Sequence, residues 1–357
     1  MVPLADGSDM MGSLRNPAAW NQIYGLRPSW GLVSRSLSLS PDLFAHQLST
    51  EGPMARNPDD LEMLLRVMIG GSGPDPSNPF SIGLGFDDTS ISSSSSNGSV
   101  TPPLSSSSSL LLSDQKIRIG WLGDLDGYLP TDPELLAFAC DAVLSLSNKM
   151  TSSSCSHLHL ATDADIKTNN IDKNIQVKVD KNVSIPFNDY QSLWKAWCTL
   201  RSWNIVSSVE KLNATEPPRK NILKPEAIYE YESGVNLSAR DITSASIIRT
   251  KWWRALVEMF QIYDFLVLPS AQCFPFPVEW NWPASVAGKE MDTYHRWMEG
   301  CIYASLGGLP ALSIPVGFVN GDIRKPVGVQ VWGAKGTDAK LIAFAKKVHA
   351  VLHGSHK

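Results

Sequence analysis

The sequence has 357 residues, a formal net charge of -4 and a pI near 6.0, and 43% of its residues are hydrophobic. This length and apolar content suit one large domain or two average ones with a substantial core. The absence of a basic stripe or polybasic cluster argues against binding to nucleic acid or to an anionic membrane surface. No apolar run in the sequence is long enough to span a bilayer.

Cysteine usage and the first residues bear on the compartment. The five cysteines are scattered, odd in number and without a C-x-x-C pair, as expected for reduced thiols in a cytosol-like compartment. The first residues contain neither the basic region nor the apolar region of a secretory signal. We therefore expect a soluble, cytoplasmic protein.

The first segment of unusual composition is D-G-S-D-M-M-G-S-L-R-N-P at residues 6–17. A serine that follows a glycine in a turn can expose its hydroxyl, and neighbouring backbone N–H groups can hold the oxyanion of a tetrahedral intermediate. The pattern suits nucleophilic acyl transfer. By itself G-S-L-R is a weak signal in so serine-rich a chain, so its weight depends on the segments that follow.

The next two segments predict a helix and an insert. The helix is expected within residues 57–71, where Asn57 is placed to cap it, Pro58 to occupy its first position, and Gly70 to end it. Four apolar residues recur there at helical spacing: Leu61, Leu64, Leu65 and Met68. Residues 87–113 consist largely of serine, and such a segment buries too little apolar surface to offset its ordering entropy. We expect it to be a disordered insert on the surface.

The rest of the chain alternates between predicted strands and helices. We predict strands at 116–122, 156–166, 265–269, 308–318 and 327–333. We predict helices at 131–150, with Thr131 as its cap, and at 190–203, 245–262 and 337–354. Strands separated by helices are typical of an α/β fold, with a mixed or mostly parallel sheet covered on both faces.

Cysteine, histidine and aromatic residues offer other candidate sites. The C-S-H-L-H stretch at residues 155–159 matches no usual zinc spacing, so we predict no metal site there. His46 and His295 are isolated, which favours hydrogen-bonded structural histidines over catalytic bases. The segment 291–299 predicts a helix that begins at Asp292. An aromatic cluster either lines an apolar acyl pocket or packs in the core: Trp280, Trp282, Tyr294 and Trp297.

Several segments together resemble the amidase signature family in order and spacing. Residues 7–18, G-S-D-M-M-G-S-L-R-N-P-A, resemble the loop that carries the nucleophilic serine of that family. Residues 24–35, Y-G-L-R-P-S-W-G-L-V-S-R, resemble its G-L-K/R-P-T/S-x-G-x-V-S segment. Residues 49–70 resemble its G-P-M-A-R segment and the helix after it, and the later apolar strands resemble its C-terminal strands. The resemblance runs from Met1 to the end, with the serine-rich segment as an insertion.

The resemblance implies a fold, a reaction and a nucleophile. The family has an α/β/α fold with a mixed central sheet, and its members act mostly on linear carboxamides, here a small-molecule amide, without a cofactor or a metal. Ser13 matches the nucleophile that forms the acyl-enzyme. The backbone N–H groups of Met10, Met11, Gly12 and Ser13 match the oxyanion hole.

Other positions of the loop are also implied by the resemblance. Asp9 and Arg15 match a polar pair that braces the loop beside the nucleophile. The family usually has glycine or alanine where Met11 stands, and methionine does not share the freedom of glycine to adopt positive φ. A slightly different turn is therefore expected at Met11.

Two members of the family's Ser–cis-Ser–Lys triad have no match in this sequence. The lysine base and the bridging serine of a G-G-S-S-G-G stretch precede the nucleophile loop in the family, and no segment of this chain resembles that stretch. We therefore expect residues 1–357 to form a single partial amidase domain whose N-terminal part is missing. Ser13 without a base is a weak nucleophile, so impaired activity is expected, and the missing part would leave apolar surface exposed.

Two alternatives to an amidase stay open. The chain could be a non-catalytic protein, either a pseudoenzyme or a truncated fragment that binds a partner. Within the family, it could be a transamidating subunit of the tRNA-dependent amidotransferase type, although residues 275–283 and 291–299 look more like free-standing amidases. No motif indicates which amide is cleaved or what the oligomeric state is.

Overall fold

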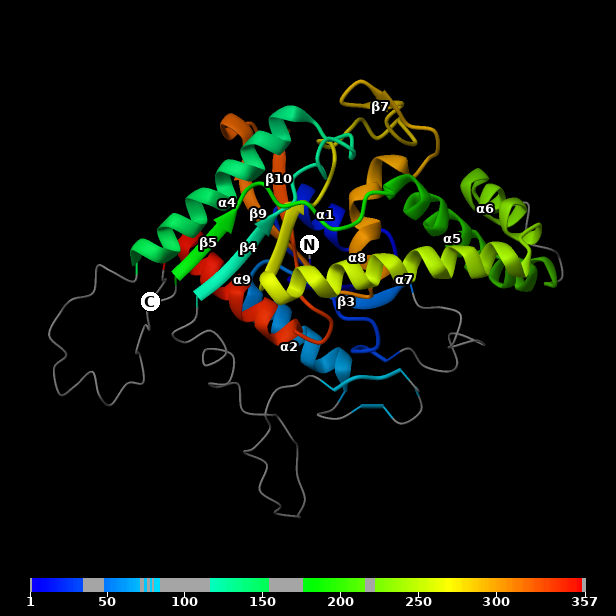
Figure 1. The fold of residues 1–357 in the computed structure, drawn as a ribbon, viewed down its shortest axis with the longest axis horizontal. Helices are drawn as coiled ribbons and strands as arrows, with labels where there is room; N and C mark the ends of the chain where they lie inside the picture. The colour runs from blue at the N-terminus through cyan, green and yellow to red at the C-terminus, as the bar shows by residue number, and fades with distance from the viewer. Residues whose placement is uncertain are drawn as a thin grey trace, which may run out of the picture.

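The computed structural model describes residues 2–34, 48–70, 74–75, 78, 80–83, 116–153, 176–215 and 222–354. Several sequence predictions lie outside these residues: the insert at 87–113, the strand at 156–166, the C-S-H-L-H stretch at 155–159, and His46. The described segments form a mixed α/β structure around one large sheet (Figure 1).

The central sheet has eight strands in the order β1-β3-β2-β9-β10-β6-β4-β5. Along the sheet these are Leu4–Asp9, Thr50–Ala55, Tyr24–Arg27, Ala311–Phe318, Pro326–Trp332, Phe265–Pro269, Lys116–Trp121 and Gln176–Asp180. Only β4 pairs in parallel, with β5 and with β6, and the other five pairings are antiparallel. The sheet is therefore mixed, but it is not mostly parallel. Parallel pairing is found where helical crossovers join the strands, whereas β9 and β10 are joined by a short connection and run antiparallel.

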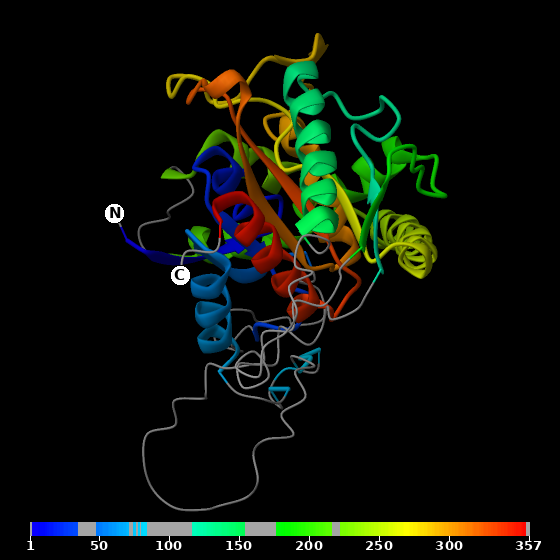
Figure 2. The ribbon, with the colours of Figure 1, turned by 90° about the vertical axis from the view of Figure 1, so that its left-hand side faces the viewer.

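Helices cover both faces of this sheet and make a three-layer α/β/α arrangement. One face packs against α2 (Pro58–Ile69), α4 (Pro133–Ser153) and α9 (Asp338–His353). The other packs against α5 (Tyr190–Asn213), α7 (Ala239–Ile262) and α8 (Ile302–Gly307). Strand β6 shows the division, because Phe265 and Val267 join the first core and Leu266 and Leu268 join the second. Figure 2 views the molecule from the side of α4.

The remaining described elements are short or lie at the periphery. Helix α1 (Arg15–Trp20) follows β1 directly, and α6 (Pro225–Val235) packs against α5. Strands β7 (Ser285–Val286) and β8 (Lys289–Glu290) form a small hairpin. Two 3-10 helices, η3 (Arg296–Cys301) and η4 (Val319–Gly321), precede α8 and β10.

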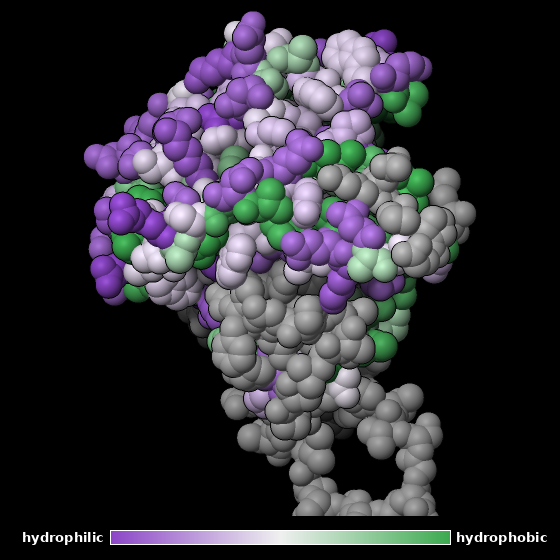
Figure 3. Space-filling view, turned by 90° about the vertical axis from the view of Figure 1, so that its right-hand side faces the viewer, coloured by the Kyte–Doolittle hydropathy of each residue, from purple (hydrophilic) through white to green (hydrophobic). Residues whose placement is uncertain are grey.

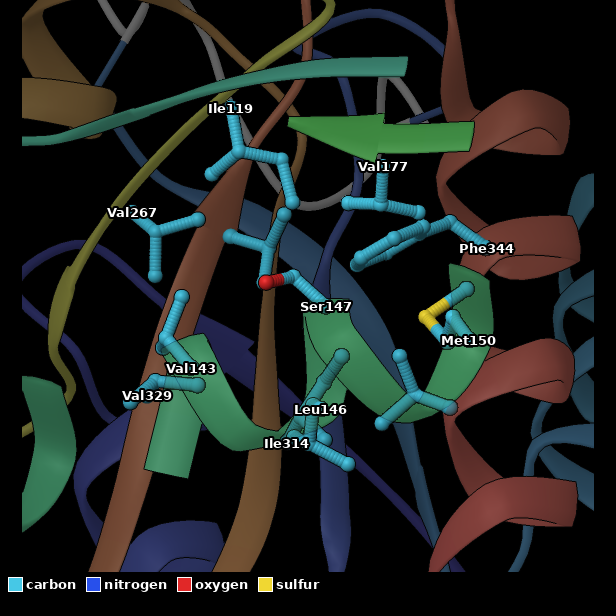
Figure 4. A pocket seen from close by; sticks show the side chains of 12 residues that line it. Ile119, Val143, Leu146, Ser147, Met150, Val177, Val267, Ile314, Val329 and Phe344 are labelled. Atoms are coloured by element: carbon cyan, nitrogen blue, oxygen red, sulfur yellow. The ribbon is translucent and has the colours of Figure 1, made fainter. Parts of the chain in front are cut away.

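A small cavity lies in the core under α4 and α9. Its volume is about 20 Å³, and its walls are apolar except at Ser147, whose hydroxyl donates to the carbonyl of Leu144 (Figure 4). Sheet residues that line it, such as Val267 and Val329, belong to the core on the α2–α4–α9 side. We interpret it as an imperfection of packing, because it has the size of about one water molecule and lacks convergent polar groups.

Several local predictions are confirmed, and two are wrong. Asn57, Pro58 and Gly70 start and end α2 as expected, with the Asn57 side chain accepting the N–H of Asp60. Helix α4 is capped by Asp132 and not by Thr131: the Asp132 carboxylate accepts the N–H groups of Glu134 and Leu135. The Thr131 hydroxyl instead donates to the carbonyl of Leu129.

The second wrong prediction concerns residues 291–299. No helix begins at Asp292, since residues 292–295 form bends and turns and η3 begins at Arg296. The aromatic side chains of this stretch pack against other segments, and these contacts override the local capping signal. Helix α5 also runs ten residues further than residue 203, to Asn213.

Apolar side chains remain exposed at scattered places on the described surface. They include Val67 of α2, Tyr229 of α6, and Ile247 and Val257 of α7. Figure 3 shows one such face, where hydrophobic patches lie between hydrophilic residues. Strands β1 and β5 are the two edges of the sheet. Among the described residues, no helix is both long enough and apolar enough to cross a membrane.

Candidate active site

The loop between β1 and α1 exposes Ser13 between two buried neighbours. Residues 10–12 form a bend and residues 13–14 a turn, and Gly12 and Leu14 are buried while Ser13 is exposed. Gly12 has φ +90°, and a Cβ atom there would lie 2.5 Å from the sulfur of Cys301. Both the dihedral angle and the close approach require glycine at this position. Met11, which is buried, is not among the residues with positive φ, so the tight turn falls on Gly12 and methionine is accommodated.

Asp9 and Arg15 stabilise this loop through buried hydrogen bonds. The Asp9 carboxylate accepts the N–H groups of Gly12 (2.8 Å) and Leu14 (3.3 Å), and it also accepts Nε (3.0 Å) and Nη2 (2.8 Å) of Arg15. Both side chains are fully buried. Burial alone would raise the pKa of Asp9, but the charge and hydrogen bonds of Arg15, the charge of Arg27 and the Gly12 N–H outweigh it and lower the pKa to about 2. The carboxylate is therefore ionised and fixed.

Arg15 also connects the loop to distant strands and helices. It donates to Gln330 Oε1 of β10 (2.9 Å) and to the hydroxyl of Ser305 in α8 (3.2 Å). The Gln330 amide in turn donates to the carbonyls of Pro269 and Gly300, both at 3.1 Å. Sequence reasoning did not identify Gln330. The sequence feature that could have indicated it is a single polar residue inside the apolar run V-G-V-Q-V-W-G.

Arg27 is a second buried cation at the base of the loop, and sequence reasoning missed it as well. Its Nη1 donates to the carbonyl of Asp9 and lies 3.8 Å from the Asp9 carboxylate, while its Nε and Nη2 have no partner among the described residues. Burial lowers the pKa of Arg27 to about 9, with Asp9 opposing and Arg15 adding to the effect. Two guanidinium groups thus share the Asp9 carboxylate, which leaves a surplus positive charge where the loop begins.

The backbone N–H groups around Ser13 are engaged to different extents. The Gly12 N–H donates to Asp9. The N–H groups of Met10, Met11 and Ser13 have no acceptor within the described part of the chain. No lysine hydrogen bond or ion pair to residues 9–15 is found in the described structure.

A polar cluster adjoins this loop. Arg201 of α5 places Nη1 3.2 Å from the sulfur of Met10. Its Nε donates to Glu230 of α6 (2.7 Å), and its Nη2 donates to the hydroxyl of Tyr294 (2.7 Å). The Tyr294 hydroxyl donates to the same carboxylate oxygen of Glu230 (2.9 Å), and the Ser202 hydroxyl donates to the other (2.6 Å). Residues 10, 201, 230 and 294 are thus brought together, and nothing in the sequence indicated this.

His295 and Cys198 lie at the edge of the cluster and are not activated. Burial lowers the pKa of His295 to about 4, with Glu230, 3.8 Å away, opposing. The Cys198 sulfur is 3.9 Å from His295 Nε2, and burial raises the pKa of its thiol to about 12. A neutral thiol beside a neutral imidazole is not a nucleophile–base pair, which supports the structural interpretation of His295.

The four aromatic residues singled out in the sequence do not form one continuous wall. Trp297 stacks on Trp20 at 5.6 Å, and Phe276 lies between Trp297 (5.2 Å) and Trp280 (6.5 Å). Trp282 instead packs on the Tyr294 ring at 6.4 Å. Across the described residues, no three histidine, cysteine or acidic side chains gather closely enough to hold a metal ion.

Comparison with known proteins decides the family. The sequence model of the family described as Amidase matches residues 1–342. This chain belongs to the amidase family. A glutamyl-tRNA(Gln) amidotransferase subunit from Archaeoglobus fulgidus is 27% identical over 351 residues, which are 97% of this chain and 64% of that protein. The relative of the same name from Sulfolobus acidocaldarius is 25% identical, with 98% of this chain and 65% of that protein covered.

Solved structures of amidase signature enzymes share the fold. A bacterial aryl acylamidase has a TM-score of 0.73 at 21% identity, with 98% of this chain and 62% of that chain covered. A glutamyl-tRNA(Gln) amidotransferase subunit from Thermotoga maritima has a TM-score of 0.59 at 22% identity, with 98% and 62% covered. The chain therefore has the α/β/α fold and mixed sheet expected from the resemblance. It spans less than two thirds of the length of the relatives it matches.

Proposed function

We propose that the chain carries the nucleophile half of an amidase site, which cleaves a linear amide through an acyl-Ser13 intermediate. Ser13 Oγ attacks the carbonyl carbon, and the C–N bond then breaks and releases the amine after it gains a proton. Water attacks the acyl-serine ester and releases the acid and free Ser13. The observation that carries this proposal is the exposed serine on a glycine turn, held by a buried Asp9–Arg15 pair in a chain of the amidase family.

In this proposal the backbone of Met10, Met11 and Gly12 forms the oxyanion hole together with the Ser13 N–H. The N–H groups without acceptors in the described part of the chain are those of Met10, Met11 and Ser13, and they are the donors open to a developing oxyanion. Gly12 contributes the turn, and its own N–H joins the hole only when Asp9 releases it. Asp9 and Arg15 act as supporting residues that preorganise the loop.

Proton transfer is the weak point of the site. Ser13 at its ordinary pKa needs a base, and an amine leaving group needs a proton. This sequence offers no lysine assigned to that role and no stretch like the family's G-G-S-S-G-G. We propose that amide turnover by this chain is slow for this reason. Activated esters and fluorophosphonates should be slowed less, because their leaving groups depart without protonation, and only the activation of Ser13 is affected.

A fluorophosphonate probe tests the nucleophile directly. We expect the probe to add covalently to Ser13, and mass spectrometry of the digested protein locates the adduct. Ser8→Ala is the matched control, because Ser8 is also exposed and lies five positions earlier on β1. Labelling that is lost in Ser13→Ala and kept in Ser8→Ala supports the proposal. An adduct on another residue, or labelling that survives in Ser13→Ala, refutes it, and no labelling at all favours the non-catalytic alternative.

Transamidation is the second candidate function, and the similarity to proteins named as subunits of glutamyl-tRNA(Gln) amidotransferase supports it. Such a role predicts that Ser13 accepts the side-chain amide of glutamine. Release of ammonia from glutamine, measured with the unaltered protein and with Ser13→Ala, distinguishes it from an amidase that acts on anilides. Release of the aniline from anilides that depends on Ser13, without release of ammonia from glutamine, excludes the transamidating function.

A further inference from the structure

The nitrogen atoms on the two sides of the Arg201 guanidinium have partners of different strength. Its Nε and Nη2 are held by Glu230 and by the Tyr294 hydroxyl, at 2.7 Å each. Its Nη1 lies 3.2 Å from the thioether sulfur of Met10. A thioether is a weak acceptor, whereas a guanidinium has five strong donors. The edge that faces the serine loop therefore has hydrogen-bonding capacity that its neighbour does not use.

The guanidinium is both fixed and accessible. The Arg201 side chain is 18% exposed, whereas the Glu230 side chain is 1% exposed. Glu230 is itself held by Ser202 and Tyr294 at 2.6 and 2.9 Å. A ligand can therefore reach Arg201 without competing for Glu230. Since the guanidinium is already oriented, binding to it costs little side-chain entropy.

The charge around the loop favours an anionic ligand. Arg15 and Arg27 are both fully buried and share the single carboxylate of Asp9. Arg27 keeps two nitrogen atoms without partners in the described structure, so no second carboxylate neutralises it there. Glu230 balances only Arg201. The surplus positive charge lies in a low-dielectric interior, where its field is weakly screened.

We propose that Arg201 is a specificity-determining residue that binds the carboxylate of an acyl group ending in an acid, so that monoamides of dicarboxylic acids are the preferred substrates. The free carboxylate takes the place of Met10 at Nη1 while the amide carbonyl lies at Ser13. This inference rests on the proposed function for the location of the amide. It is independent of whether the chain completes the reaction.

Binding to the Ser13→Ala protein tests the inference without any chemistry. Succinamic, glutaramic and adipamic acids are compared by calorimetry with butyramide, pentanamide and hexanamide, which match them in carbon number. We expect at least one acid to bind about tenfold more tightly than its apolar counterpart, the size of one charge-assisted hydrogen bond. Arg201→Gln, in the same background, should remove that preference.

Two further variants separate recognition from folding and from bulk charge. Arg201→Lys keeps a cation beside Glu230 but loses the nitrogen that corresponds to Nη1, so the preference for the acids should fall. This variant still tests the inference if Arg201→Gln fails to fold. Lys195→Gln removes a positive charge from an exposed position of the same helix and should leave the preference intact. Equal affinity for every acid and its apolar partner, including no binding of either, overturns the inference. So does a preference that survives in Arg201→Lys and Arg201→Gln. Failure of fluorophosphonate labelling overturns only the proposed function.

Discussion

Replacing Asp9 by asparagine should strongly destabilise the folded chain. The carboxylate accepts four hydrogen bonds, two from backbone N–H groups and two from Arg15. Asparagine keeps one oxygen acceptor and turns an amide N–H₂ toward donors, so about two of the four bonds are lost. Removing one partner of a buried ion pair typically costs about 3–5 kcal/mol. We expect a loss of this size in the free energy of unfolding at pH 7.

Urea denaturation followed by tryptophan fluorescence measures this loss, since the chain contains 12 tryptophans. Asp6→Asn is the matched control, because Asp6 is an exposed carboxylate on the same strand and should change stability by less than about 0.5 kcal/mol. The double variant Asp9→Asn/Arg15→Met should lose about 2 kcal/mol less than the sum of its single variants, because the paired charges are removed together. An Asp9→Asn protein within about 1 kcal/mol of the unaltered one would refute the reasoning that burial makes this pair essential.

Three other predictions concern single sites. Gly12→Ala should lose at least about 2 kcal/mol and its fluorophosphonate labelling, because alanine at φ +90° is strained and its Cβ would meet the Cys301 sulfur at 2.5 Å; unchanged labelling would contradict this. Val329→Ile should add about 1 kcal/mol by filling the 20 Å³ cavity, and a loss in urea denaturation would mean the cavity is too small. Burial raises the pKa of Glu299 from 4.5 to about 6, so its ionisation lowers the stability of the folded chain as pH rises through 6. The free energy of unfolding of Glu299→Gln, relative to the unaltered protein, should therefore rise by about 2 kcal/mol between pH 4 and 7. A difference in this free energy that stays constant with pH would exclude this.

The parts of the fold that the sequence predicts are those fixed by local chemistry. Helix α2 is bounded by a cap, a proline and a glycine that act within one turn of its ends. Strand β6 is apolar at every position because helices cover both faces of the sheet. Local signals also compete: Thr131 and Asp132 are adjacent capping residues, and the carboxylate that accepts two N–H groups prevails over the hydroxyl.

The parts that could not be predicted depend on contacts between distant segments. Arg15 and Gln330 are 315 positions apart, and Arg201 and Glu230 are brought together by the packing of α5 on α6. The turns at residues 292–295 likewise depend on tertiary contacts, which override the capping signal of Asp292. Asp9 and Arg15 were identified only through resemblance to the family; the structure pairs their side chains, while their role in supporting the nucleophile stays a prediction.

The serine loop is organised by residues that belong to this chain, and this separates two ways in which activity can fail. Asp9, Arg15, Arg27 and Gln330 fix the turn through buried contacts, and none of these contacts involves the family's lysine. A missing base should therefore slow the cleavage of amides much more than acylation by activated esters, because only the amine must be protonated as it leaves. A disordered loop should slow both. The ratio of p-nitrophenyl ester to anilide rates thus reports on the base alone. A ratio far below that in water, with both reactions dependent on Ser13, would show that the site contains a base we have not identified.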